Sequence, residues 1–99
     1  MNLYEMNEEF EKHDVMEEFG EFHKVSKHLS ERPDLHAFIL LDKLCPSNKS
    51  IVSESGHDQF WLNVDVNDFA KVATPELILA LIRCGVMFDY DEDCLYMFP

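Results

Sequence analysis

Hydrophobic residues recur at helical spacing through the first thirty positions. A first stripe is followed, after a slip in phase near positions 13–14, by a second. The two stripes are Leu3, Met6 and Phe10, and then Val15, Phe19, Phe22, Val25 and Leu29. We therefore predict helix over about 3–29 with a kink near 13–14. Asp14 stands where an N-cap of the second part belongs.

A second apolar stretch follows Pro33, which disfavours helical geometry at the residue before it. Its apolar residues have helical spacing, and Pro46 closes the stretch. We predict a helix over about 34–45. Because residues 36–41 are almost continuously apolar, a buried strand is an open alternative for that segment.

The pattern changes from helical to alternating after Ser47. Apolar and polar positions alternate between Phe60 and Val66, with Trp61 on the polar side. This alternation predicts a β-hairpin over 51–66 with one face exposed to water. A second hairpin is predicted over 86–98, where two apolar runs flank an acidic turn.

One further helix is well marked, at 74–84. Thr74 is a good N-cap, Pro75 fits the first helical position, and Gly85 is a typical stop. Together these elements predict an α+β fold, in which the N-terminal helices and this helix pack on a small antiparallel sheet.

Chain length limits the number of domains, and the charged residues are unevenly distributed. The 99 residues allow one acidic domain, 1–99, with a formal net charge of −12. Residues 1–22 carry eight carboxylates against Lys12 alone, and residues 53–99 carry nine against Lys71 and Arg83. The middle of the chain, by contrast, is weakly basic.

Sequence features also indicate the cellular compartment of the protein and the redox state of its cysteines. The acidic first twenty residues do not have the basic and apolar regions of an export signal, and no apolar run approaches the roughly 20 residues of a membrane span. Three cysteines without CxxC spacing indicate free thiols. We expect a cytoplasmic protein without a membrane partner.

Metal-binding patterns are incomplete. Residues 89–93 read D-Y-D-E-D, like the opening of a calcium loop, but Cys94 stands where that loop needs glycine. The histidines form no HExxH pattern and no paired Glu-x-x-His pattern. We expect neither a metal site nor a cofactor.

Catalytic patterns are also missing. Three glycines cannot build a phosphate-binding loop, and the chain has no nucleophile elbow. Cys84 falls in the last turn of a helix, and Cys94 follows several acids, so neither position favours a thiolate. We therefore expect a protein that is not an enzyme.

The carboxylates themselves are the main candidate site. If residues 1–22 were one helix, they would present roughly one carboxylate per 4 Å. A DNA strand carries one phosphate per ~3.4 Å, so this surface could occupy a basic groove in place of nucleic acid. The expected partner-binding residues are Glu8, Glu11, Glu17, Glu18, Glu21, Asp89, Asp91, Glu92, Asp93 and Trp61. The simpler reading, a solvated acidic face that aids solubility, is an alternative.

The resulting hypothesis is a non-catalytic inhibitor that blocks the basic nucleic-acid-binding surface of a partner protein. We expect no direct binding of nucleic acid. In general character the small acidic chain is similar to inhibitors by which phages mimic DNA, as in anti-restriction or anti-CRISPR proteins. The alternative is an adaptor, or an immunity or antitoxin type of protein, that binds through an apolar patch around Trp61.

Overall fold

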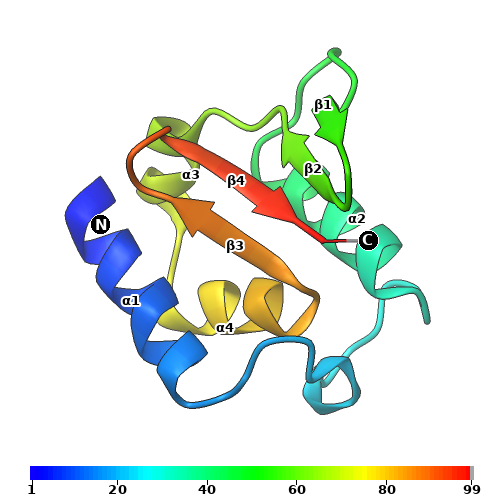
Figure 1. Ribbon diagram of the computed structural model, residues 1–99. Coiled ribbons are helices and arrows are strands. Elements are labelled where there is room, and N and C mark those ends of the chain that lie inside the picture. Colours follow the sequence, from blue (N-terminus) through cyan, green and yellow to red (C-terminus); the bar gives the residue numbers. More distant parts are fainter. Residues whose placement is uncertain (99) are drawn as a thin grey trace.

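The computed structural model describes residues 1–98 and shows helices packed on a four-stranded sheet (Figure 1). The helical elements are α1 (Leu3–Val15), the 3-10 helix η1 (Phe22–Lys24), α2 (Pro33–Leu44), α3 (Val66–Val72) and α4 (Pro75–Arg83). The strands are β1 (Val52–Gly56), β2 (Gln59–Leu62), β3 (Val86–Asp89) and β4 (Cys94–Met97). The predicted α+β fold class is confirmed.

The sheet is antiparallel throughout, in the order β1-β2-β4-β3. Its two faces differ because side chains alternate along each strand. In β3 and β4 the buried side chains are Val86, Phe88, Leu95 and Met97, and those between them are partly exposed. The buried face packs on helices, whereas no described helix lies over the other face, which is turned toward the viewer in Figure 1.

The hydrophobic core lies between the buried sheet face and the helices. Each α-helix contributes fully buried apolar side chains, including Phe10 of α1, Leu41 of α2, Phe69 of α3 and Leu81 of α4. Burying a side chain of this size stabilises the fold by about 1.5–3 kcal/mol. The core therefore fixes α1 and the sheet relative to each other.

The first helix is shorter than predicted. It begins with a capping box between Asn2 and Glu5 and ends at Val15, where Glu17 adopts a left-handed φ of 60°. The backbone N–H of Glu17 bonds to the carbonyl of Asp14, and that of Glu18 bonds to the carbonyl of His13. These two bonds form a Schellman cap, so the helix ends at the position where we predicted only a kink.

Residues 16–29 are consequently not a second α-helix, and that part of the prediction is wrong. Asp14 caps no helix, and only η1 is helical in this segment. The backbone N–H of Gly20 donates to the carbonyl of Ile82, which ties the segment to the end of α4. Long-range bonds of this kind replace the local helical ones, and a hydrophobic pattern cannot reveal them.

Residues 36–41 are helical, which resolves the alternative left open by the sequence. They lie inside α2, whose Ala37 and Leu41 are completely buried. Neither this helix nor any other among residues 1–98 has both the length and the apolar character needed to span a bilayer.

The second half of the chain follows the predicted order, with one addition. The hairpin of β1 and β2 ends at Leu62 rather than near residue 66, and α3 begins at Val66. Asp65 caps α3 by accepting bonds from the N–H groups of Asn67 and Asp68. The helix near 74–84 and the hairpin within 86–98 are confirmed as α4 and as β3 with β4.

Candidate functional site

The two acidic ends of the sequence meet at one corner of the molecule. The turn between β3 and β4, residues 90–93, lies near the first turns of α1 (Figure 1). The rings of Phe10 and Phe88 are 5.9 Å apart, and those of Phe88 and Tyr90 are 6.1 Å apart. We call this region the acidic corner and define it by Glu8, Glu11, Asp91, Glu92 and Asp93.

The pKa of Tyr4, in α1, responds to two acids of the acidic corner, Glu8 and Glu11. A hydrogen bond to Glu8 raises the pKa of Tyr4 above its ordinary value of 10.0, and the charge of Glu8 adds to this effect. Burial makes a smaller contribution, followed by Tyr90 and Glu11. Tyr4 therefore lies close to Glu8 of its own helix and to Tyr90 of the β3–β4 turn.

The carboxylates of the acidic corner have no cationic partners within residues 1–98. Among the acids of this described part, Lys or Arg pairs only with Glu18 and Asp68. Histidines face three more acids, which are Glu9, Glu21 and Glu31. The negative charge of the corner is consequently not neutralised within this part of the chain.

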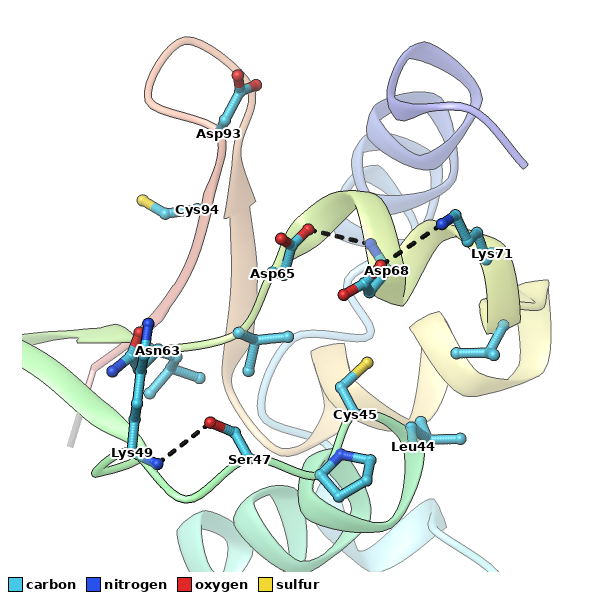
Figure 2. Close-up of a pocket in the computed structure, with 14 residues that line it drawn as sticks. Leu44, Cys45, Ser47, Lys49, Asn63, Asp65, Asp68, Lys71, Asp93 and Cys94 are labelled. Atoms are coloured by element: carbon cyan, nitrogen blue, oxygen red, sulfur yellow. Dashed lines mark hydrogen bonds and ion pairs between the residues drawn. The ribbon is translucent and has the colours of Figure 1, made fainter.

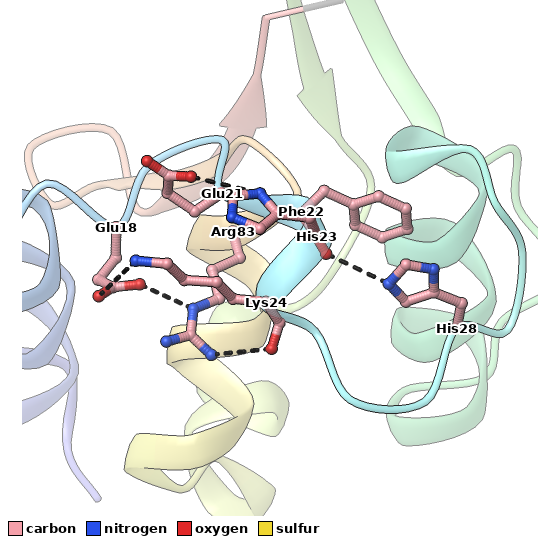
Figure 3. A network of polar contacts seen from close by, with 7 residues as sticks. All are labelled: Glu18, Glu21, Phe22, His23, Lys24, His28 and Arg83. Carbon is pink, nitrogen blue, oxygen red and sulfur yellow. Dashed lines mark hydrogen bonds and ion pairs between the residues drawn. The ribbon is translucent and has the colours of Figure 1, made fainter.

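Glu18 lies beyond the end of α1 and is held in an internal ion-pair network (Figure 3). Its carboxylate accepts a 2.8 Å bond from Nε of Arg83 and lies 3.9 Å from Nζ of Lys24. The bond from Arg83 lowers the pKa of Glu18 below its ordinary value of 4.5. Glu18 thus fastens the segment after α1 to the end of α4.

The other two acids of this segment also lie apart from the acidic corner. Glu17 is exposed in the turn that ends α1, and the carboxylate of Glu21 lies 3.4 Å from Nδ1 of His23. The structure therefore brings Glu8 and Glu11 together with the β3–β4 turn, but leaves 17–21 at the far end of α1. The expected single helical row of carboxylates over residues 1–22 is not present.

Trp61 lies on the uncovered face of the sheet, in a hollow of about 490 Å³. It pairs with Glu54 of β1 on one side and with Tyr96 of β4 on the other. We call this region the sheet hollow, and its lining residues are Ser53, Glu54, Gln59, Trp61, Asp89, Glu92 and Cys94. Trp61 therefore lines the same hollow as two of the expected partner-binding acids, Asp89 and Glu92.

Carboxylates dominate the electrostatics of the sheet hollow. The side chain of Asp89 is oriented by the turn, because its Oδ1 accepts a 3.1 Å bond from the N–H of Glu92. Burial raises the pKa of the Cys94 thiol above its ordinary value of 9.0, and Asp89, Glu92 and Asp93 raise it further. Burial and then Asp89 also raise the pKa of Tyr96. The Cys94 thiol and the Tyr96 hydroxyl therefore lie in a region of negative electrostatic potential.

The thiols are poorly suited to nucleophilic chemistry. Burial raises the pKa of Cys84 from 9.0 to about 12. Burial and the charges of Asp68 and Asp65 raise the pKa of Cys45. Since the thiolate is the reactive form, these cysteines are protonated and weakly reactive near neutral pH.

A larger cleft, of about 730 Å³, lies between the end of α2 and α3 (Figure 2). Its wall carries charges of both signs, and Lys71 pairs with Asp68 at 3.5 Å. Within residues 1–98, no group of three His, Cys, Asp or Glu side chains is arranged to hold a metal ion.

One residue of the candidate surface was not singled out from the sequence. Glu54 lies directly opposite Trp61 because the β1–β2 turn pairs Gly56 with Gln59 and so fixes the register. The turn residues at 55–58 are recognisable in the sequence. Counting residue pairs outward from this turn would place position 54 opposite position 61.

The fold and these surfaces define a small acidic α+β protein with two adjoining carboxylate-rich regions. The chain matches no protein-family model, no curated protein and no solved structure. The chemistry of these surfaces is therefore the basis for a proposed function.

Proposed function

We propose that this protein is a non-catalytic inhibitor that blocks the basic nucleic-acid-binding groove of a partner protein. The acidic corner enters the groove and prevents nucleic acid from binding there. The supporting observation is that acids from both ends of the chain converge at this corner without a cationic partner in residues 1–98. A net charge of −12 would also speed association with a basic surface.

The test requires capture of a partner and then a displacement assay. The tagged protein is incubated with nuclease-treated lysate of its source at about 50 mM salt, and captured proteins are identified. Each is then loaded with a fluorescein-labelled DNA duplex, and anisotropy is followed as the inhibitor is added. We expect the inhibitor to displace the duplex, with an affinity that falls steeply toward about 200 mM salt.

A matched pair of variants separates the acidic corner from net charge. The triple change Glu8→Gln, Glu11→Gln and Asp91→Asn should weaken displacement at least about tenfold. The control is Asp42→Asn, Asp58→Asn and Glu76→Gln, which removes three exposed acids elsewhere and should have a much smaller effect. Equal loss in both variants, or a partner that binds DNA and this protein together, would contradict the proposal.

The acids beyond the end of α1 make a less informative test than those of the acidic corner. Charge reversal at Glu17, Glu18 and Glu21 would break the bond between Glu18 and Arg83. A loss of binding in that variant would then mix damage to the fold with loss of docking. Substitutions at the acidic corner avoid this problem.

The second candidate function is an adaptor that binds through the apolar surface around Trp61. It is favoured by one observation, the position of Trp61 beside Tyr96 on a sheet face without a described helix over it. An adaptor complex would be insensitive to salt and lost on Trp61→Ala, while the triple change at the acidic corner would leave it intact.

A further inference from the structure

Residues 25–32 form an irregular segment between η1 and α2, which we call the strap. No side chain of the strap belongs to the buried core. Its middle is fastened by two bonds to imidazole rings: Nε2 of His28 bonds to the carbonyl of Phe22, and the N–H of Leu29 donates to Nδ1 of His36. Because a segment with few buried apolar contacts opens more easily than the core, these bonds strongly affect whether the strap stays in place.

The bonds at the two rings require opposite charge states. Nε2 of His28 lies 3.2 Å from the Phe22 carbonyl oxygen, and Nδ1 lies 3.1 Å from a carboxylate oxygen of Glu31. Both partners only accept hydrogen bonds, so the two bonds form together only when His28 is an imidazolium. His36 accepts a 3.0 Å bond at Nδ1 and must therefore be neutral. The complete set of bonds thus corresponds to a charged His28 beside a neutral His36.

The two rings are close enough for one charge to influence the other. Their centroids are 6.1 Å apart, and the ring of Phe22 stacks on His28 at 4.2 Å and meets His36 edge-on at 5.6 Å. Burial lowers the pKa of His36 below its ordinary value of 6.5, and the charge of His28 lowers it further. A proton on His28 therefore opposes a second proton on His36.

The charged groups of the neighbouring elements are bonded to other partners. These groups are Lys24 of η1 and Arg83 of α4, which face Glu18, His23 of η1, which faces Glu21, and Asp34 of α2, which accepts a bond from the N–H of Leu35 (Figure 3). Lys27 and Arg32, the cations of the strap itself, are exposed and form no ion pair within residues 1–98. In this described part, Glu31 is the acid bonded to the histidine pair.

We propose that His28 and His36 form a pH-sensitive switch: with His28 charged and His36 neutral the strap is held on α2, and a proton on His36 releases residues 25–32 while the core stays folded. A proton on Nδ1 of His36 removes the acceptor of the Leu29 N–H and places two imidazolium rings side by side. Release uncovers the ring of Phe22 and the first turn of α2. The switch is separate from the proposed inhibition, because none of its residues belongs to the acidic corner.

Amide exchange of the ¹⁵N-labelled full chain tests the switch. Exchange is measured from about pH 7.5 to about pH 5 and corrected for its intrinsic pH dependence, at Leu29 by saturation transfer from water and at the fully buried Leu81 by exchange into deuterium oxide. We expect protection of Leu29 to fall below about pH 6.5, by up to about tenfold per pH unit, because the released strap binds a proton at His36 that the closed strap resists. Leu81 should remain far better protected, since its exchange requires the core to unfold.

Long-range ¹⁵N–¹H spectra of the histidine rings identify the protonated nitrogens in the same samples. We expect His36 to keep an unprotonated Nδ1 while His28 already carries protons on both nitrogens. Loss of Leu29 protection should follow protonation of His36.

Three variants make the test specific. In His36→Gln the Leu29 profile should be flat after correction, because glutamine does not titrate in this range. His28→Gln keeps a donor for the Phe22 carbonyl but removes the charge, so the total loss of Leu29 protection should be smaller. The control Glu21→Gln changes the acid beside the exposed His23 and should leave the Leu29 profile within about twofold of the native one.

Several results would overturn the inference. These are an unprotected Leu29 at neutral pH, a profile that is the same in the native protein and in His36→Gln, and a His36 that binds its proton before His28. Equal protection of Leu29 and Leu81 at every pH would also overturn it, since the strap would then open only with the whole fold. The assay uses no partner protein, so its failure leaves the proposed function to be decided by DNA displacement.

Discussion

His36 is a buried histidine in the first turn of α2. Only 3% of its surface is exposed, and its Nδ1 accepts a 3.0 Å bond from the N–H of Leu29. Burial lowers the pKa of His36 below 6.5, and the nearby His28 lowers it further. The neutral ring thus anchors the non-helical segment 25–32 to α2.

The lowered pKa predicts a loss of stability in mild acid. Below about pH 6.5 the unfolded chain binds a proton at His36 that the folded protein resists, so the free energy of unfolding falls as pH decreases. Protonation also converts Nδ1 from acceptor to donor and breaks the bond from Leu29. Urea denaturation at pH 7.5, 6.5 and 5.5 measures the decline.

The variant His36→Gln isolates this contribution, because glutamine does not titrate in that range. It should be less stable than the native protein at pH 7.5, but should lose less of its remaining stability by pH 5.5. Parallel pH profiles of the two proteins would show that His36 does not cause the decline.

At the scale of elements, the end of α1 decides the course of the next ten residues. Glu17 adopts a left-handed φ of 60°, a conformation that costs a residue with a Cβ about 1 kcal/mol relative to glycine. Its negative charge at a helix C-terminus is also unfavourable. The helix nevertheless ends there, because Glu18 and Gly20 bond to the end of α4.

Glu17→Gly should therefore stabilise the protein by about 1 kcal/mol, which corresponds to a rise of about 4–8 °C in Tm for a chain of this size. Glu17→Ala is the control, since it removes the charge but keeps the Cβ. Differential scanning calorimetry of the three proteins checks the prediction. A larger gain from alanine than from glycine would mean that charge, and not backbone strain, limits this cap.

At the scale of the whole molecule, unpaired negative charge should oppose folding. The Cα extents are 29 × 29 × 27 Å, and the Debye length is about 30 Å at 10 mM salt but about 8 Å at 150 mM. At low salt, every carboxylate therefore repels the others across the molecule. We expect NaCl over this range to raise stability by about 1 kcal/mol and Tm by about 5 °C.

Thermal unfolding followed by circular dichroism measures this dependence. The triple variant Glu8→Gln, Glu11→Gln and Asp91→Asn should have a higher Tm at low salt and a weaker response to NaCl. A Tm that falls as NaCl is added would indicate that ion pairs such as Glu18 with Arg83 outweigh the repulsion.

The architecture also changes the form of the proposed mimicry. A rod of carboxylates along residues 1–22 would follow a groove lengthwise, whereas the observed acids are arranged around one end of α1 and the edge of the sheet. A compact corner covers a short part of a groove and depends more on individual contacts.

The candidate site was only partly predictable. The acids of α1 and of the β3–β4 turn are recognisable in the sequence as two charged segments. Their proximity depends on packing of Phe10 against Phe88, at a separation of 78 positions along the chain. The internal role of Glu18 depends on Arg83, which lies 65 positions further along the chain.

By itself, the sequence determined the features that local rules govern. Apolar periodicity and Pro75 with Gly85 located α4, and alternation around turn residues located both hairpins. Only the tertiary structure decided that residues 16–29 leave the helical path and which acids share a surface. The physical reason is that caps and periodicity act within a few residues, whereas burial and long-range hydrogen bonds select among the conformations that local preferences leave open.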